Sequence, residues 1–353
     1  MTLDEVLLRQ WHRVASAGLL RTRVDDTLRR RIPGDMGLVI QYNPNHIKNK
    51  RPVDEQLMAG TNSTKLEDRG FNFTKANCAE VLGGLRFSSD EEQTLSNVQL
   101  IEICNDEFLW NKEVSHFALV NISPLFYGHM LFVPDLRLVK PQVMTKDFLW
   151  YALSITFTMN RSDFALGFNS AGAWSSVNHF HLQGYFFPPL EDSLNFPVTF
   201  QVRKLLHQVR GAIVSSLPNW KTSCYVIEPK DVSTDVDHVV RIGWYLLEIL
   251  QSRGIPHNLL IVGLVIFIFP RQLQRENGVN LFSSDKTTTI STGRLRIAVA
   301  EVAGLVVAGD STAYHALTEE MLNMILQTEV SLSADEEKAL EAEWKLKIDC
   351  KTE

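Results

Sequence analysis

Apolar residues follow a helical period in several parts of the chain. From Leu3 to Val14 they recur every three or four residues, and Pro33-Gly34 follows downstream. This pattern predicts a helix over residues 3–31. The same period predicts further helices over 146–159, 199–216, 232–252, 317–326 and 334–348.

Short apolar runs bounded by turn residues predict strands. These runs lie at 37–42, 98–104, 117–122, 130–134, 164–168, 179–187, 223–227 and 257–269. Polar residues dominate 44–70 and 271–292, which are expected to be loops. Strands and helices follow one another without a regular β-α-β rhythm, so the pattern favours an α+β fold with an antiparallel sheet and flanking helices. The apolar strands at 116–134 are echoed at 257–270, which is weak evidence for a duplicated chain.

Composition narrows the class of protein. The 353 residues carry a net charge of −6, which argues against a broadly basic surface for nucleic acid. The longest apolar run, 259–269, is shorter than the ~20 residues that a membrane-spanning helix needs. The first residues lack the order of charges and apolar residues typical of a signal peptide. The widely spaced cysteines, Cys78, Cys104, Cys224 and Cys350, are expected to be reduced thiols. A cytoplasmic protein that binds neither membrane nor nucleic acid is predicted.

One predicted strand carries an unusual polar pattern. Residues 179–187 read His-Phe-His-Leu-Gln-Gly-Tyr-Phe-Phe. Because side chains alternate along a strand, His179, His181 and Gln183 are expected to share one face. A buried imidazole without a partner costs a few kcal/mol, roughly, so this face needs an explanation.

Four interpretations of this face remain open from the residues alone. The histidines are hydrogen-bonded structural residues, or His179 and His181 bind a metal ion. Alternatively, the strand is the polar recognition face of a binding module. Finally, one neutral imidazole is a nucleophile that attacks phosphorus, with neighbouring groups donating to the phosphoryl oxygens. The preceding loop suits this last chemistry, because it carries several short polar side chains and Gly172.

The stretch resembles the histidine-triad superfamily, in its His-x-His-x-Gln nucleotidyltransferase branch. Residues 167–186 are similar to the animal GDP-D-glucose phosphorylases and to the plant GDP-L-galactose phosphorylases. Further similar segments lie at 71–75, 120–134, 257–258 and 300–304. The resemblance implies a histidine-triad-like fold in a duplicated arrangement, like that of galactose-1-phosphate uridylyltransferase. The first half, residues 1–195, would carry the motif, and 196–353 would be a degenerate second half.

The resemblance also implies a reaction and its residues. GDP-glucose and phosphate would give glucose 1-phosphate and GDP through a guanylylated His181, without a metal ion or other cofactor. His179 would orient the nucleophile and Gln183 would donate to the phosphoryl group. Residues expected to bind the substrates are Asn169 and Ser176 at the phosphate oxygens, Asn121 at the ribose, and Lys75 at the phosphate charge.

Alternatives to this function are kept. Water replacing phosphate would make the protein a nucleotide-sugar or dinucleotide hydrolase, and loss of turnover would leave a GDP-sugar-binding protein. A homodimer is a further possibility. The connection between Ile261 and Val265 is very short. The resemblance leads us to expect a longer insert at this place.

Overall fold

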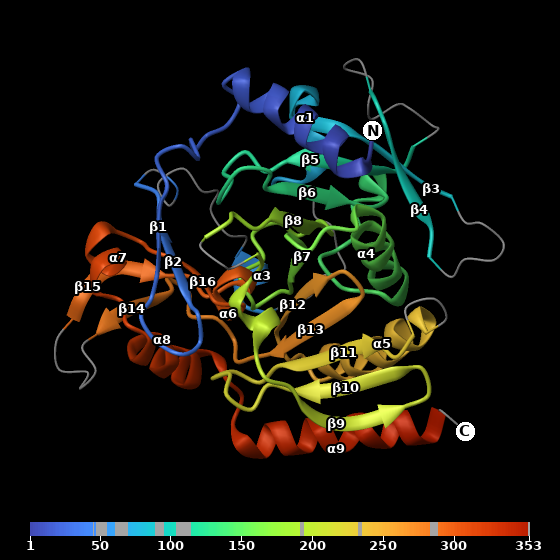
Figure 1. The fold of residues 1–353 in the computed structure, drawn as a ribbon, viewed down its shortest axis with the longest axis vertical. Coiled ribbons are helices and arrows are strands. Elements are labelled where there is room, and N and C mark those ends of the chain that lie inside the picture. Colours follow the sequence, from blue (N-terminus) through green and yellow to red (C-terminus); the bar gives the residue numbers. More distant parts are fainter. Residues whose placement is uncertain are drawn as a thin grey trace.

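An antiparallel sheet of eleven strands forms the centre of the protein (Figure 1). The computed structural model describes residues 1–44, 46, 55–60, 70–88, 95–103, 114–190, 194–231, 235–282 and 289–351. Within them the strand order is β4-β3-β5-β6-β8-β7-β12-β13-β11-β10-β9. The strands are β3 (Val81–Ser88), β4 (Asn97–Ile101), β5 (His116–Val120), β6 (Met130–Val133), β7 (Phe164–Asn169), β8 (Leu182–Phe186), β9 (Lys204–Val209), β10 (Ala212–Ser216), β11 (Tyr225–Pro229), β12 (His257–Val262) and β13 (Val265–Pro270).

The strand order repeats itself on the two sides of the sheet centre. Next to the edge strand β4 the order is β3-β5-β6-β8-β7, and from the opposite edge it is β9-β10-β11-β13-β12. In each set a helix follows the third strand: α4 (Lys146–Met159) comes between β6 and β7, and α5 (Val236–Ser252) between β11 and β12. The sheet is therefore built from two repeats of one connectivity. The two repeats join in the segment between β8 and β9; the division of the chain at residue 195 stays a prediction.

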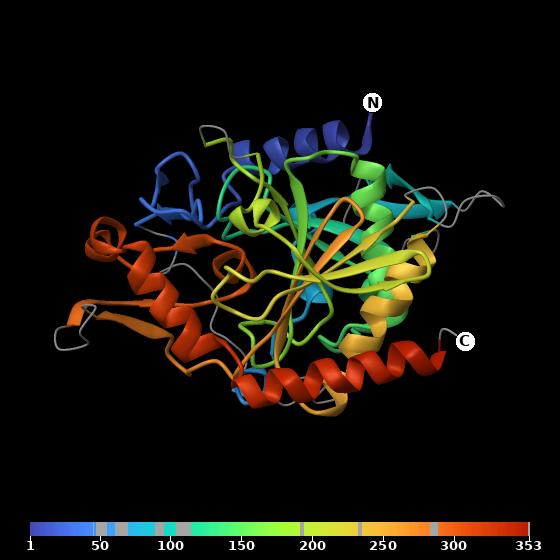
Figure 2. The same cartoon turned by 60° about the horizontal axis from the view of Figure 1, so that its bottom comes forward.

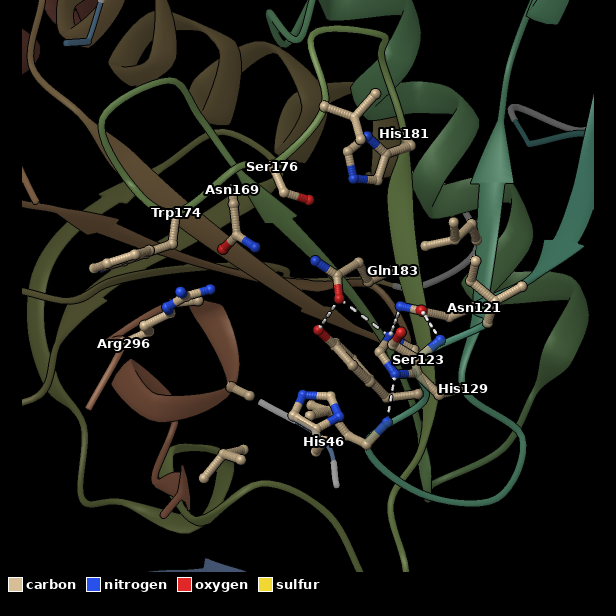
Figure 3. Close-up of a pocket in the computed structure, with 18 of the residues that line it drawn as sticks. His46, Asn121, Ser123, His129, Asn169, Trp174, Ser176, His181, Gln183 and Arg296 are labelled. Atoms are coloured by element: carbon tan, nitrogen blue, oxygen red, sulfur yellow. Dashed lines mark hydrogen bonds between the residues drawn. The ribbon is translucent and has the colours of Figure 1, made fainter. Parts of the chain in front are cut away.

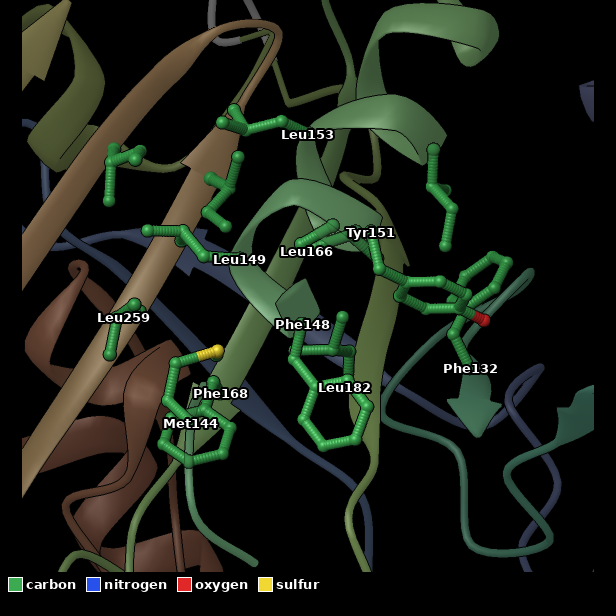
Figure 4. Close-up of a cluster of buried hydrophobic side chains, with 14 of the residues drawn as sticks. Phe132, Met144, Phe148, Leu149, Tyr151, Leu153, Leu166, Phe168, Leu182 and Leu259 are labelled. Atoms are coloured by element: carbon green, nitrogen blue, oxygen red, sulfur yellow. The ribbon is translucent and has the colours of Figure 1, made fainter. Parts of the chain in front are cut away.

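One face of the sheet is covered by helices. α1 (Leu3–Ser16) packs on β3 and β4, α4 and α5 pack side by side, and α9 (Ala334–Lys351) packs on α5 (Figure 2). Between this layer and the sheet lies a large core of buried aliphatic and aromatic side chains (Figure 4). Burial of this apolar area supplies the main drive for folding.

The other face is covered by segments from both ends of the chain. β1 (Leu28–Arg31), β2 (Val39–Tyr42) and β16 (Leu305–Val307) form a small sheet, in which β2 and β16 pair in parallel. Around it lie β14 (Val279–Phe282), β15 (Thr289–Leu295), α6 (Val299–Val302), α7 (Ser311–Ala316) and α8 (Glu319–Ile325). No helix within the described ranges is long and apolar enough to cross a membrane.

Shorter elements complete the fold. They are α3 (Glu55–Met58), the 3₁₀ turns η1 (Phe73–Lys75), η2 (Cys78–Glu80), η3 (Leu136–Leu138) and η4 (Pro197–Phe200), and the π turn η5 (Leu326–Val330). The turns η1 and η2 lie just before β3 and bring residues 71–80 beside the histidine segment.

The predicted α+β class and most predicted elements are confirmed. The helix expected over 3–31 is wrong beyond residue 16, because the chain turns at Gly18, where φ is +72°. The helix expected over 199–216 is also wrong, since that segment forms η4 and the hairpin β9–β10. The strand expected over 257–269 is two strands joined at Gly263, and 271–292 contains β14 and part of β15. Cys104 and most of the loop expected at 44–70 lie outside the described residues.

The core on α4 gives a test of the fold. Leu149 is fully buried between α4 and the sheet, whereas Phe157 on the same helix is 36% exposed. We expect Leu149→Ala to lower the free energy of unfolding by about 2–5 kcal/mol, because it removes buried methyl groups and leaves a cavity. Phe157→Ala, the matched control, is expected to change it by less than about 1 kcal/mol. Urea denaturation measures both, and equal losses would contradict this placement of the core.

Candidate active site

A cavity of about 130 Å³ lies over the middle of the sheet (Figure 3). It is lined by His181, Gln183, Asn169, Ser176 and Asn121, which are five of the seven residues predicted from the sequence. The side chains come from three separate segments of the first repeat: the end of β5, the end of β7 with its following loop, and the start of β8. The structure therefore brings these predicted residues together. His179 and Lys75 do not line the cavity.

The imidazole of His181 is held in one tautomer. Its Nδ1 lies 2.9 Å from the backbone oxygen of His179, and because a carbonyl only accepts, Nδ1 carries the hydrogen. The other nitrogen, Nε2, keeps its lone pair and is directed toward the cavity (Figure 3). Burial lowers the pKa of His181 to about 4, so the ring is neutral at pH 7. A neutral imidazole with a lone pair in a cavity is the form that acts as a nucleophile.

The side chain of His179 lies behind the cavity. The chain bends at Asn178 and His179, and β8 begins only at Leu182, so regular alternation does not extend back to residue 179. The Nδ1 atom of His179 accepts from the backbone N–H of Phe73 at 3.1 Å. Of the three polar residues expected on one face, only His181 and Gln183 reach the cavity. His179 contacts the His181 ring through its backbone oxygen and not through its side chain.

Gln142, which the sequence analysis did not find, fixes the backbone around His181. Its Oε1 accepts from the backbone N–H of His181 at 2.9 Å. Its Nε2 donates to the backbone oxygens of His181 and Asn169, both at 3.1 Å. The side chain is 1% exposed, and an unpaired buried backbone group would cost ~1–3 kcal/mol. Gln142 therefore ties the ends of β7 and β8 together next to His181.

The amide of Gln183 is oriented by two donors. Its Oε1 accepts from the Tyr185 hydroxyl at 2.8 Å and lies 3.1 Å from Nε2 of His129. Nδ1 of His129 accepts from the backbone N–H of Leu125, so the hydrogen of a neutral ring is on Nε2, which donates to Gln183. With its oxygen held in this way, the amide nitrogen of Gln183 is directed into the cavity (Figure 3).

The amide of Asn169 is oriented by the second repeat. Its Oδ1 accepts from Nδ2 of Asn258 at 2.6 Å and from the backbone N–H of Val299 at 2.9 Å. Asn258 in turn accepts from the guanidinium of buried Arg271 at 3.2 Å. Because both bonds hold the oxygen, the amide nitrogen of Asn169 is left to donate into the cavity (Figure 3).

The loop between β7 and β8, residues 170–181, is also clamped by the second repeat. The backbone N–H of Ser170 donates to the oxygen of His257 at 3.0 Å, and that of Gln274 donates to the oxygen of Gly172 at 2.9 Å. Trp174 has a φ of +70°, which is strained for a bulky residue, and its N–H donates to the Gln274 side chain. These bonds fix the loop that presents Ser176 to the cavity.

Arg296 places a positive charge at the cavity. Its guanidinium lies 5.5 Å from the ring centre of Trp174 and also lines the cavity. Burying the charged guanidinium of Arg296 has a free-energy cost, which lowers its pKa. An anion bound beside it would offset that cost. Arg296, the two amide nitrogens and Ser176 together form a set of donors suited to phosphoryl oxygens.

Asn121 and Lys75 differ in their surroundings. Asn121 lines the cavity, but its Oδ1 accepts from the backbone N–H of Ser123 at 3.0 Å. Lys75 is exposed, and its Nζ donates to the oxygen of Gly70 at 2.7 Å. Among the described residues, Arg294 and Arg296 line the cavity, and Lys75 does not. In the part of the chain that the structure describes, no group of three His, Cys, Asp or Glu side chains is arranged to hold a metal ion.

Two known family models match this chain. A family described as "GDPGP1-like, N-terminal domain" matches residues 2–185, and one described as "GDPGP1-like, C-terminal domain" matches residues 199–349. The chain belongs to the GDPGP1-like family. The two matched ranges are separated by residues 186–198, which run from the last residue of β8 to just before β9, near the join of the two structural repeats.

Two named relatives of this family member cover most of its length. It is 27% identical to GDP-L-galactose phosphorylase 2 of Arabidopsis thaliana over 340 residues, which are 94% of this chain and 73% of that protein. It is 26% identical to GDP-D-glucose phosphorylase 1 of Danio rerio over 333 residues, which are 92% and 85% of the two chains. Among solved structures, yeast Ap4A phosphorylase in complex with Ap4A shares the fold, with a TM-score of 0.60 at 15% identity. That match covers 93% of this chain and 98% of the yeast chain.

The sequence marks some residues of this family member's site as candidates, but it does not mark others. His129 lies within the segment 120–134 and interrupts an apolar strand, which marks it as a buried polar residue. Asn258 lies in the short similar segment 257–258. Gln142 follows a proline in an unremarkable loop, and nothing in its neighbourhood distinguishes it from an exposed glutamine.

The buried histidines give a test by pH. Burial lowers the pKa of His257 to about 4, below the ~6.5 of an unfolded chain. Between these values the unfolded chain binds a proton that the fold does not, so stability falls as the pH is lowered. The loss from this one group is about 2 kcal/mol at pH 5. His257→Leu removes this group, and we expect its free energy of unfolding to fall less steeply between pH 7 and 5, measured by urea denaturation. Identical slopes in the two proteins would contradict the prediction.

Proposed function

We propose that this protein is a GDP-hexose phosphorylase that converts GDP-D-glucose and phosphate into glucose 1-phosphate and GDP. The observation that carries the proposal is the geometry of His181. Its Nδ1–H is held by the oxygen of His179, and its Nε2 lone pair faces a cavity lined with donors to phosphoryl oxygens. The names of the relatives supply the substrate class, because both are GDP-sugar phosphorylases.

In the first half of the proposed reaction, Nε2 of His181 attacks the α-phosphorus of GDP-glucose. A P–N bond forms, and the bond from the α-phosphorus to the bridging oxygen breaks. Glucose 1-phosphate leaves, and the guanylyl group stays on the histidine. The ring becomes positively charged on attack, and the oxygen of His179 accepts from its Nδ1–H throughout. The tautomer needed for attack is thus already in place.

In the second half, an oxygen of inorganic phosphate attacks the same phosphorus. The P–N bond breaks, GDP forms, and Nε2 of His181 recovers its lone pair. One histidine therefore serves both halves, and the order of events requires glucose 1-phosphate to leave before phosphate reacts. No proton has to pass through a side chain in either half.

The charge that develops on the phosphoryl oxygens is met by groups already directed at the cavity. The amide nitrogens of Asn169 and Gln183 are neutral donors whose orientation is fixed by bonds to their oxygens. Arg296 adds a positive charge. Donors that are held in place before reaction need no reorganisation in the transition state, which is the main electrostatic contribution to catalysis.

The choice of acceptor separates phosphorolysis from hydrolysis. In the presence of phosphate we expect GDP-glucose to yield glucose 1-phosphate and GDP. Chromatography of the nucleotides measures this conversion. Without phosphate the reaction is expected to stop after about one turnover per site, because the guanylyl group has no acceptor. Steady formation of GMP at the same rate with and without phosphate would identify a hydrolase. Binding of GDP-glucose without any product would identify a binding protein.

The nucleophile is tested by substitution. We expect His181→Ala to lower turnover by about 10⁴-fold or more, because the covalent route is lost. In the unsubstituted protein, incubation with GDP-glucose alone should add the mass of one guanylyl group, located on His181 by mass spectrometry of peptides. The matched control is His12→Ala on the exposed face of α1, which should keep both turnover and labelling. Labelling that persists in His181→Ala would refute the assignment.

A further inference from the structure

A row of paired residues leads away from the nucleophile across the floor of the cavity. Gln183 on β8 pairs with Leu131 on β6, Leu131 pairs with Leu119 on β5, and Leu119 pairs with Val81 on β3. Directly paired residues share a face of the sheet. Neighbouring strands lie ~4.8 Å apart, so the row spans roughly 14 Å. Glu80, which precedes Val81, lies at its far end and lines the same cavity.

The two ends of this row differ in chemistry. Near Gln183 are the donors suited to phosphoryl oxygens. The floor between the ends is apolar, because Leu131 and Leu119 both line the cavity. Phe73 and Phe71 form an aromatic wall, with ring centres 5.7 Å apart, and the Phe73 ring lies 5.1 Å from the His181 ring. An apolar floor beside aromatic rings is suited to a flat heterocycle.

A carboxylate at the far end restricts which heterocycle fits. Guanine presents two adjacent donors on one edge, N1–H and the 2-amino group, and the two oxygens of a carboxylate accept both. Adenine presents an acceptor at N1, which would face the carboxylate. Uracil presents one N–H between two carbonyl oxygens, which would also face it. Of the three bases, only guanine matches the charge-assisted pair.

We propose that Glu80 binds the N1–H and 2-amino groups of guanine and makes the site selective for guanine nucleotides. This inference rests on the proposed function, since it assumes that the α-phosphorus lies at His181. The distance along the row suits it: the phosphate lies by Gln183, the base lies over Leu131 and Leu119, and the guanine edge meets Glu80. Glu80 is thus a specificity-determining residue for the base.

Inosine nucleotides give the sharpest test, because hypoxanthine keeps N1–H and lacks the 2-amino group. A hydrogen bond to a charged group is worth ~1.5–3 kcal/mol, so the full-length protein should bind GDP about 10- to 150-fold more tightly than IDP by calorimetry. In Glu80→Gln the affinity for GDP should fall toward that for IDP, leaving a ratio below about 3-fold. The ratios of kcat/KM for GDP-glucose and IDP-glucose should follow the same pattern.

The control is Glu301→Gln, which alters the other carboxylate of the described cavity lining. Glu301 accepts from the backbone N–H of Ala298, away from the proposed base position, so its GDP-to-IDP ratio should stay near that of the unsubstituted protein. Retention of IDP binding by Glu80→Gln shows that this variant folds.

The outcomes separate the inference from the function on which it rests. A ratio in Glu80→Gln equal to that of the unsubstituted protein overturns the role of Glu80, and so does equal binding of GDP and IDP to the unsubstituted protein. In both cases phosphorolysis of GDP-glucose, measured separately, leaves the proposed function standing. If the protein prefers GDP through Glu80 but shows no turnover, the proposed base site stands and the proposed phosphorylase activity is refuted.

Discussion

The pairing of β7 with β12 is the constraint on which the site depends. It joins the two repeats into one sheet and places Asn169 directly opposite Asn258. The hydrogen bond between their side chains then fixes the amide of Asn169. The same register places the loop after β7 next to residues 257–258 and 272–274. A shift of this register by one residue would turn Asn169 to the opposite face of the sheet. The central backbone ladder thus determines both the join between the repeats and the direction of a cavity donor.

The two repeats share a connectivity and differ in what their loops do. In the first repeat, twelve residues, 170–181, separate β7 from β8 and include His181, the proposed nucleophile. In the second, only Gly263 and Leu264 separate the equivalent strands β12 and β13. The unusually short connection noticed in the sequence therefore lies where the first repeat holds its chemistry. His257 shows the same local bond as His181, from Nδ1 to the oxygen two residues earlier, but its Nε2 is buried without a hydrogen-bond partner.

The sequence predicted those parts that local pattern determines. The helix 146–159 has a capping threonine and is buried over most of its length, and it was predicted to the residue. Segment 199–216 was misjudged, because Leu205, Leu206 and Val209 fit both periods and only the turn at Gly211 indicates a hairpin. Alternation found His181 and Gln183. It failed for His179, which precedes the strand, and for Gln142, whose bonds to His181 cross 39 positions of chain and leave no local trace.

The short β12–β13 turn also bears on how such a chain can evolve. A duplicated chain with two complete loops would have two equivalent sites, each restricting change in its own half. Here the second half makes no covalent step in the proposed reaction, and its contribution to the site is concentrated in a few anchoring groups: the charge of Arg296 at the cavity and the bonds from Asn258, Arg271 and Gln274. The rest of its surface is released from catalysis. Substitutions that create a new partner surface or a new regulatory contact in this half would leave the chemistry of the first half undisturbed, as long as the anchoring groups named above persist.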